Sequence, residues 1–221
     1  MEPGSVINEY LKEGLDVWGL AIPAEKLTSF VTYFGLLLAE NQKFNLISPK
    51  QDLKTKVAVH LLDSLSPLLL IRLPAAKRIM DFGSGGGLPG IPLSLVWSYE
   101  KFDLVESTGK KARFLSQVVN QLDLKNVSVI NDYLEPDRAD SPKYDLITTR
   151  AVSALGNILA IAGPRLTVGG YFLAFKGPQV ADELSAAGPQ ILKYGLKLIE
   201  RKDFSLPLVS MNRTLLLYRK I

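Results

Sequence analysis

The sequence of 221 residues contains no cysteine and only one histidine. Without thiols the chain can form no disulfide, no thiolate metal site and no cysteine nucleophile. A single imidazole also excludes a metal site built from several histidines. We therefore expect no bound metal, and any chemistry must come from carboxylates, amides, hydroxyls, lysines or arginines.

Long apolar runs are missing as well. No hydrophobic stretch approaches the roughly 20 residues that a membrane-spanning helix needs. The first residues, MEPGSVINEYLKEG, lack the basic-then-apolar order of a signal peptide. The sequence predicts a cytoplasmic protein that does not enter a membrane, and we expect a monomer.

The net charge is small, at +4, but the basic residues are unevenly spread. Residues 190–221 hold 7 Lys and Arg against 2 Asp and Glu, whereas the earlier parts of the chain are nearly balanced. A basic segment of this kind is either an ordinary solvated surface or a surface that contacts phosphates. The sequence leaves both interpretations open.

The first 75 residues show the apolar spacing of helices. Hydrophobic side chains recur every three or four positions over residues 6–18 and 24–41. A third helical stretch covers residues 53–70, and Pro74 closes it. We expect residues 1–75 to form a small helical cap.

Residues 76–221 instead alternate between short strands and helices. The expected strands are 77–82, 102–106, 127–130, 144–149 and 171–176, and the expected helices are 89–97, 109–122, 152–166 and 180–194. Strict alternation predicts a parallel sheet with helices on both faces. Two last strands, 196–206 and 214–219, are joined by a short turn and must pair antiparallel. The predicted α/β fold is a seven-stranded, mostly parallel sheet ending in an antiparallel hairpin, which is typical of class I methyltransferases.

A glycine-rich loop follows the first expected strand, in the segment RIMDFGSGGGLPGIPL. Glycine allows the backbone to turn sharply and to approach a ligand closely. Gly85, Gly87 and Gly90 satisfy the dinucleotide pattern G-x-G-x-x-G, and Glu106 ends the next strand at the distance expected of a ribose-binding carboxylate. The first cofactor to consider is therefore NAD.

The same loop also satisfies D-x-G-x-G-x-G, the pattern of S-adenosylmethionine enzymes, from Asp81 to Gly87. In that interpretation Asp81 faces the cationic aminoacyl end of the cofactor and Glu106 accepts from the ribose hydroxyls. A dinucleotide has no ammonium group for Asp81 to meet, although Asp81 could instead simply fix the loop. With the terminal hairpin, we favour S-adenosylmethionine, which leaves S-adenosylhomocysteine as product. An NAD-dependent oxidoreductase is the alternative.

Six segments in order carry a resemblance to a known family. They are NQKFNLIS (41–48), HLLDSL (60–65), DFGSGGGLPGIPL (81–93), VESTGKKARFL (105–115), TRA (149–151) and FLAFKGP (172–178). Together they closely resemble the ribosomal RNA small-subunit methyltransferase G family. The resemblance implies methylation of N7 of a guanine in the decoding-region (530) loop of 16S ribosomal RNA, with that RNA or the small ribosomal subunit as partner. A non-catalytic RNA-binding protein that assists ribosome assembly is a further alternative.

The resemblance also implies which residues contact the cofactor. In addition to Asp81 and Gly85 of the loop pattern, the implied contacts are Gly83, Leu88, Glu106, Ser107, Thr108, Leu134, Glu135 and Arg150. The family usually has a small residue where Leu134 stands.

Two residues at strand ends are the candidates for catalysis by positioning. Guanine N7 carries a lone pair and no proton, so its methylation requires no general base. Lys176 ends the fifth strand and could donate to guanine O6 beside N7, or it could simply be solvated. Arg150 ends the fourth strand and could contact the cofactor, an RNA phosphate or a nearby acid.

RNA contacts are expected from the cap and from the helix after the second strand. His60, Asp63 and Ser64 share one face of a helix, and we expect them to brace the cap against the cofactor loop, with His60 as a possible RNA contact. Asn45 either reads a base edge or caps a helix end.

Three cations, Lys110, Lys111 and Arg113, lie at a helix start, where the helix dipole disfavours them unless a phosphate is bound. With Lys176 these residues form the expected RNA-binding set. Tyr171, Phe172 and Phe175 on the fifth strand are expected in the core.

Overall fold

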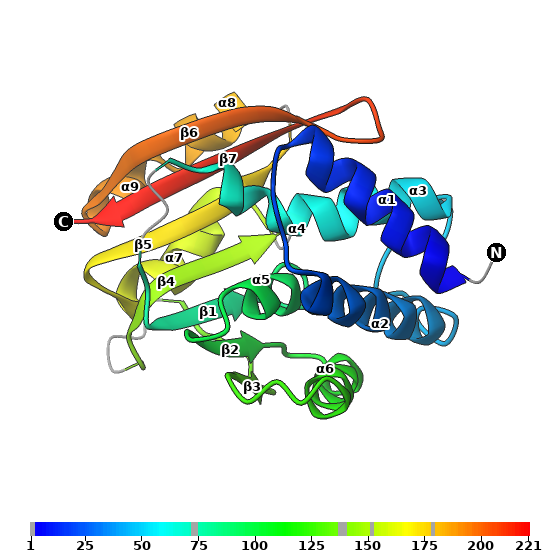
Figure 1. Cartoon of the computed structure of the whole chain (residues 1–221). Coiled ribbons are helices and arrows are strands. Elements are labelled where there is room, and N and C mark those ends of the chain that lie inside the picture. Colours follow the sequence, from blue (N-terminus) through cyan, green and yellow to red (C-terminus); the bar gives the residue numbers. More distant parts are fainter. Residues whose placement is uncertain (1–2, 72–74, 137–140, 151–152, 178–179) are drawn as a thin grey trace.

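The computed structural model describes residues 3–71, 75–136, 141–150, 153–177 and 180–221 (Figure 1). The predicted fold is confirmed: a seven-stranded sheet has the order β3-β2-β1-β4-β5-β7-β6. The strands are β1 (Arg78–Phe82), β2 (Lys101–Val105), β3 (Val127–Ile130), β4 (Tyr144–Arg150), β5 (Leu166–Lys176), β6 (Leu196–Leu206) and β7 (Met211–Lys220). The first five pair in parallel, and β7 is antiparallel to both β5 and β6.

The antiparallel strand β7 brings its first residues to the functional edge of the sheet. Lys176, the last residue of β5, pairs with Thr214 near the start of β7. Because the carboxyl ends of the parallel strands lie at this same edge, Arg213 joins the ends of β4 and β5. The hairpin therefore contributes to the edge where open α/β sheets bind ligands.

Helices cover both faces of the sheet, and the side chains of β5 are buried alternately under the two layers. Leu173 and Phe175 belong to one buried cluster, with the cap, α5 (Gly90–Val96) and α6 (Gly109–Gln121). Phe172 and Ala174 belong to the other, with α7 (Leu155–Arg165) and α8 (Val180–Ala186). Side chains of successive strand residues point to opposite faces, so one strand serves both cores.

Two expected elements differ in detail from the structure. The helix expected over residues 180–194 is divided into α8 and α9 (Gly188–Lys193), because Pro189 lacks the N–H that a continuous helix would need. The strand expected over residues 171–176 begins earlier, at Leu166, and its pairing with β4 shifts register between Tyr144 and Leu146. Two glycines within 166–171 had obscured the strand pattern.

The cap packs its helices on the first of these two clusters. It comprises α1 (Pro3–Val17), α2 (Ala24–Glu40), α3 (Leu53–Lys56), the π-helical turn η1 (Val57–Leu62), α4 (Asp63–Leu65) and the 3₁₀ turn η2 (Ser66–Leu69). The stretch expected as one regular helix is thus interrupted by a π turn, a feature that often marks functional sites. Among the described residues, no helix is long and apolar enough to cross a membrane.

Candidate active site

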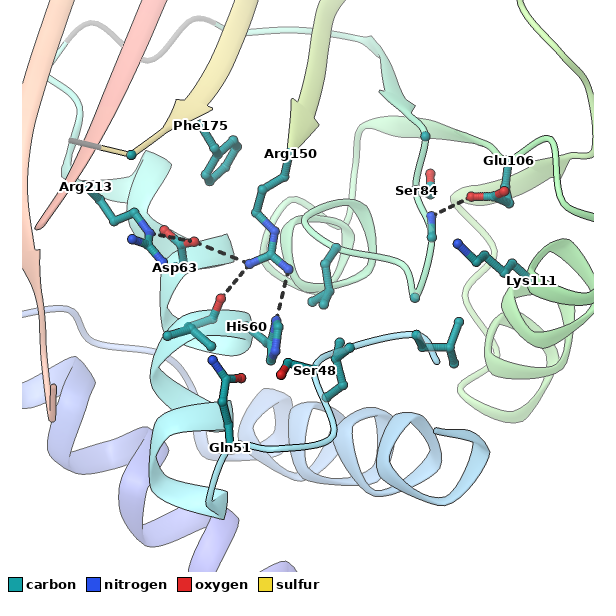
Figure 2. A pocket seen from close by; sticks show the side chains of 18 of the residues that line it. Ser48, Gln51, His60, Asp63, Ser84, Glu106, Lys111, Arg150, Phe175 and Arg213 are labelled. Carbon is teal, nitrogen blue, oxygen red and sulfur yellow. Dashed lines mark hydrogen bonds and ion pairs between the residues drawn. The ribbon is translucent and has the colours of Figure 1, made fainter. Parts of the chain in front are cut away.

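A cavity of about 680 Å³ lies where the carboxyl ends of the strands meet the cap (Figure 2). The glycine loop and Glu106 form one side, and the cap residues and Arg213 form the other, with Arg150 between them. A second cavity of about 420 Å³ shares Gly83 and Ser107 with the first. Both cavities therefore border the glycine loop.

The glycine loop has a backbone that only glycine adopts easily. Gly83, Gly85 and Gly87 have φ angles of 69°, 58° and 93°. A Cβ on Gly87 would also come within 2.6 Å of the Ile91 side chain. The loop is therefore fixed in a shape that exposes its backbone to the cavity, where Gly83 and Gly85 line the wall.

The cap holds this loop from behind through α2. The buried hydroxyl of Tyr33 donates to the carbonyl of Gly86 at 2.8 Å. A Cβ on Gly86 would meet the Leu37 side chain at 2.8 Å, so the α2 surface and the loop fit closely. Tyr33, rather than the predicted cluster at His60, is the residue that braces the cap against the cofactor loop.

Glu106 lies directly after β2, as its spacing from the loop predicted. Its carboxylate is buried and accepts from the Gly85 N–H at 2.9 Å and from the Thr108 N–H at 2.7 Å. These bonds join the glycine loop to the start of α6. Each carboxylate oxygen has a further lone pair, so Glu106 can still accept from ligand hydroxyls in the cavity.

The expectation for Asp81 needs correction. Its side chain is fully buried, lines neither cavity, and accepts from the Gly90 N–H at 3.0 Å where α5 begins. A Cβ on Gly90 would come within 2.6 Å of this carboxylate. The carboxylate therefore packs directly on the Gly90 backbone, with no space for a ligand between the two. Burial raises the pKa of Asp81 to about 7. Asp81 fixes the loop to α5, which was the alternative left open by the sequence.

The residues after β3 line the smaller cavity. Leu134 contributes there with Val105 and Ile161, which gives the cavity an apolar wall. Glu135 is exposed and lines neither cavity, and its main-chain carbonyl accepts from Arg165 at 3.1 Å. The two neighbours of Glu135, Leu134 and Pro136, line the smaller cavity, and the cofactor contact of Glu135 stays a prediction. Leu88 lines the larger cavity.

Arg150 crosses from the end of β4 to the π turn of the cap. Its guanidinium donates to the Val59 carbonyl at 2.7 Å and to Asp63 Oδ2 at 3.3 Å, and it contacts His60 Nδ1 at 3.2 Å (Figure 2). Arg213 approaches the same oxygen of Asp63 at 3.4 Å. One carboxylate thus joins two arginines from different strands to the cap.

The protonation of this cluster follows from its contacts. Burial, and then the charges of Arg150, Lys56 and Arg213, lower the pKa of His60 to about 3. Because arginine can only donate, His60 Nδ1 accepts and the neutral ring carries its proton on Nε2. Burial raises the pKa of Asp63, while Arg150 and Arg213 act in the opposite direction.

Lys176 ends β5 and lines the larger cavity, where the sequence placed it. It is not a freely solvated lysine, because its side chain is only 8% exposed and forms an ion pair with Glu183 of α8. An ammonium group has three N–H donors, so one ion pair leaves donors for a ligand. Lys176 is therefore held in place at the cavity wall.

Comparisons with known proteins identify the family. The family model described as rRNA small subunit methyltransferase G matches residues 26–210. The chain belongs to this family. Two curated relatives carry the name Ribosomal RNA small subunit methyltransferase G: one from Pelotomaculum thermopropionicum, 34% identical over 98% of this chain and 92% of the relative, and one from Rubrobacter xylanophilus, 40% identical over 80% and 68%.

Solved structures confirm the methyltransferase fold. A methyltransferase from Pyrococcus furiosus matches with a TM-score of 0.58 at 14% identity, covering 86% of this chain and 96% of that one. An O-methyltransferase from Brevibacillus brevis, in complex with S-adenosylhomocysteine, matches with a TM-score of 0.56 at 16% identity, covering 83% and 78%. The protein is an S-adenosylmethionine-dependent methyltransferase, and the NAD alternative is set aside.

The site of this methyltransferase fits that cofactor. The positive-φ glycine loop, the buried Glu106 after β2 and the apolar second cavity suit an aminoacyl group, a ribose and an adenine respectively. Ser107 and Thr108 line the larger cavity beside Glu106. No group of three His, Asp or Glu side chains in the described part of the chain could hold a metal ion.

Only some of the expected RNA-binding residues line the larger cavity. Lys111 lines the larger cavity, whereas Lys110 lies over the Phe44 ring at 4.9 Å and Arg113 is exposed on α6. Asn45 is exposed, and the capping role considered for it belongs to Asn41, whose side chain accepts from the Leu46 and Ile47 N–H groups.

Sequence reasoning missed several residues of the cavity wall: Ser48, Gln51, Phe175 and Arg213. Phe175 was expected in the core, and it is buried, but it also lines the cavity beside Arg150, its partner on β4. The position of Phe175 next to Lys176, at the end of β5, was the sequence feature that could have indicated its place in the cavity wall. Arg213 reaches the site because β7 pairs with β5; the short turn predicted the β6–β7 hairpin, but residue spacing gives no signal for the pairing of β7 with β5.

Proposed function

We propose that the protein transfers a methyl group from S-adenosylmethionine to N7 of a guanine in the 530 loop of 16S ribosomal RNA. The observation that carries the proposal is a cavity with a cofactor-binding side at Glu106 and a cationic side at Lys176 and Arg150. The names of the relatives support ribosomal RNA of the small subunit as substrate. We further propose that the protein acts as a cytoplasmic monomer.

The cofactor is held by the glycine loop, Glu106, Ser107 and Thr108, with Leu134 beside the adenine. Glu106 is already oriented by two main-chain N–H groups, so it accepts ribose hydroxyls without further rearrangement. When bound, S-adenosylmethionine supplies an electrophilic methyl group on a sulfonium. Arg150 lines the same cavity, but its guanidinium is turned to the cap, so it acts on the substrate side.

Methylation of N7 requires positioning and no proton transfer. The N7 lone pair forms the new N–C bond while the S–C bond breaks and its electron pair remains on sulfur. No general base takes part, which agrees with a neutral His60 whose Nδ1 is occupied by Arg150. Lys176, fixed by Glu183, donates to guanine O6 and leaves the N7 lone pair free.

The RNA backbone is proposed to lie at the edge of the larger cavity, between α6 and the loop of the cap that contains Phe44 and Asn45. Lys110, Lys111 and Arg113 lie together at the start of α6, and Lys110 joins this helix to the cap loop through Phe44. Asn45 lies exposed on that loop and His60 lines the cavity below. Phosphates at this rim would offset the cost of cations at a helix start.

The decisive test is methyl transfer from labelled S-adenosylmethionine to small ribosomal subunits and to naked 16S RNA from a strain that lacks this gene. The expected product is N7-methylguanine at a single position in the 530 loop. Failure to modify either substrate, with cofactor binding intact, would overturn the proposed substrate. RNA binding without release of S-adenosylhomocysteine would instead favour the non-catalytic alternative.

Lys176→Ala then tests positioning. We expect kcat to fall at least about tenfold with the KM for S-adenosylmethionine nearly unchanged, because the variant loses a donor that acts on the base. Lys125→Ala, a change at an exposed lysine beyond the far end of α6, is the matched control. An unchanged kcat in Lys176→Ala would remove Lys176 from the mechanism.

A further inference from the structure

Three buried polar atoms on the cap side of the larger cavity have no hydrogen-bond partner among the described residues. They are Gln51 Oε1, His60 Nε2 and Asp63 Oδ1, and all three residues line the same cavity. Leaving a buried polar atom without a hydrogen-bond partner destabilises the folded protein. The three atoms themselves are buried, so a ligand in the cavity reaches them only when the side chains beside them shift; three such atoms on residues of one wall point to a ligand that completes their hydrogen bonds.

The hydrogen-bonding character of these three atoms is defined by their surroundings. Gln51 Oε1 is an acceptor, and so is the Asp63 carboxylate, whose other oxygen faces Arg150 and Arg213. His60 Nε2 is a donor, because its Nδ1 accepts from Arg150. The three unpaired atoms of the wall are therefore one donor and two acceptors, and the Gln51 amide adds N–H donors beside its oxygen.

This set is complementary to the Watson–Crick edge of only one RNA base. Guanine presents one acceptor, O6, and two donors, the N1–H and the N2 amino group. Cytosine and uracil each present two acceptors and one donor, and adenine presents one of each. Only guanine can satisfy one donor and two acceptors together.

Lys176 at O6 favours guanine over adenine, and the wall adds contacts with the N1 and N2 positions. Adenine carries an N7 atom with the same in-plane lone pair as guanine, so methylation at N7 does not by itself select guanine. When N7 faces the cofactor side of the cavity, the N1 and N2 side of the purine faces away from it. Figure 2 shows Asp63 and Gln51 on the side of the cavity away from Glu106 and Ser84.

We propose that Gln51, His60 and Asp63 read the Watson–Crick edge of the target guanine and exclude adenine. This inference rests on the proposed function and adds the residues that select the base. Proteins commonly read unstacked RNA bases on this edge. A base lacking one partner leaves a buried group unpaired, which is how a polar site rejects analogues.

Asp63 also stabilises the transition state. As the N–C bond forms, positive charge moves from sulfur to the purine, and the N1–H becomes a stronger donor. Its hydrogen bond to the carboxylate is then stronger in the transition state than in the bound substrate. Arg213, whose contacts with Asp63 and Asn212 are long at 3.4 and 3.3 Å, can move aside when the base enters.

The test uses a synthetic 16S RNA hairpin with guanosine, inosine or adenosine at the methylated position. Inosine differs from guanosine only by lacking the N2 amino group. We measure kcat/KM for methyl transfer and, without cofactor, hairpin affinity by fluorescence anisotropy. The wild type is expected to prefer guanosine over inosine about tenfold or more in both assays, and adenosine is expected to be inactive.

Gln51→Leu is expected to bring the guanosine-to-inosine ratio close to one, because Gln51 accepts from the N2 amino group that inosine lacks. Asp63→Asn is expected to lower kcat on both RNAs, because inosine keeps the N1–H from which Asp63 accepts. Gln190→Leu is the matched control, since Gln190 also has a buried Oε1 without a partner in the described chain but does not line this cavity. An unchanged ratio in Gln51→Leu together with an unchanged kcat in Asp63→Asn, with S-adenosylhomocysteine bound as tightly as by the wild type, would overturn the inference.

Failure of the inference is distinguishable from failure of the proposed function. If the wild type methylates no RNA, the proposed function fails, but the cofactor-free binding assay still reports whether guanosine is preferred. If the wild type makes N7-methylguanine, Gln51→Leu keeps its base preference and Asp63→Asn keeps its kcat, only the inference fails. Gln51→Leu removes no ion pair, so its result holds even if Asp63→Asn does not fold.

Discussion

The hydroxyl of Tyr33 in the cap donates to the carbonyl of Gly86 in the cofactor loop at 2.8 Å. The contact joins residues 53 positions apart and is buried, so it attaches the cap directly to the loop. The helical cap is therefore part of the cofactor site. Its role extends beyond covering the sheet.

Tyr33→Phe should weaken cofactor binding more than it weakens the fold. The variant leaves the Gly86 carbonyl without its donor, at a cost of about 1–3 kcal/mol, and frees the loop to shift. We expect the KM for S-adenosylmethionine to rise several-fold with the KM for RNA unchanged. Tyr218→Phe is the control, because the Tyr218 hydroxyl is buried without a partner in the described chain. Equal effects of both changes on cofactor KM would contradict the prediction.

Glu106→Gln should lower cofactor affinity directly. The amide offers one acceptor oxygen, so it cannot accept from both Gly85 and Thr108 and still bind ribose hydroxyls. Hydrogen bonds to a charged group contribute about 1.5–3 kcal/mol, so S-adenosylhomocysteine should bind roughly 10–100-fold more weakly by calorimetry. Glu9→Gln, on the exposed side of α1, should bind normally. A wild-type affinity in Glu106→Gln would exclude a role in binding.

Asp81→Asn should change how stability depends on pH. Asp81 has its pKa raised from 3.8 to about 7, so between these values the folded protein holds a proton that the unfolded chain releases. Its contribution to the free energy of unfolding is present below pH 4 and is lost as the pH rises to 7. The amide does not titrate, so the variant should gain stability relative to wild type over this window, by up to about 4 kcal/mol.

Thermal melts of both proteins from pH 4 to pH 8 check this prediction. His60 acts in the opposite sense, since its pKa is lowered from 6.5 to about 3 and its contribution is lost as the pH falls. The difference between variant and wild type at each pH removes the His60 contribution. Parallel curves would show that Asp81 titrates normally. Asp16→Asn, at an exposed position on α1, is the control.

Lys110→Ala and Arg113→Ala should weaken RNA binding mainly at low salt. Each phosphate contact contributes about 0.7 to the slope of log affinity against log salt concentration for single-stranded RNA. We expect each variant to reduce the slope by about that amount, without changing the preference for guanosine. Filter binding of 16S RNA at several salt concentrations measures it. If the slope equals that of Lys125→Ala, the start of α6 does not contact phosphates.

The elements and the cofactor loop could be predicted because local patterns determine them. The strand before Gly83, the glycines and Glu106 lie within 29 residues, and each follows from strand ends and turn geometry. The role of Asp81 could not be predicted, because the pattern does not show whether a strand-terminal acid faces the cavity or the next helix. The structure resolves this through its bond to Gly90.

The substrate side of the site was harder to predict because distant segments build it. Arg150, Asp63 and Arg213 come from β4, the cap and β7, and their meeting depends on sheet order and on the π turn. The π turn has no residue signature, so the shared face of His60 and Asp63 was assigned to a regular helix. The residues were identified from their motif, but their partners were not.

The position of β7 between β5 and β6 also affects how the protein is made. During synthesis β6 emerges before β7. Because β7 is its only neighbour in the sheet, β6 cannot join the sheet until β7 has paired with β5. Arg213, which contacts Asp63 in the cavity, arrives with that last strand. A nascent chain on the ribosome therefore lacks both the complete seven-stranded sheet and the Arg213 side of the cavity, and it gains them together when β7 is inserted.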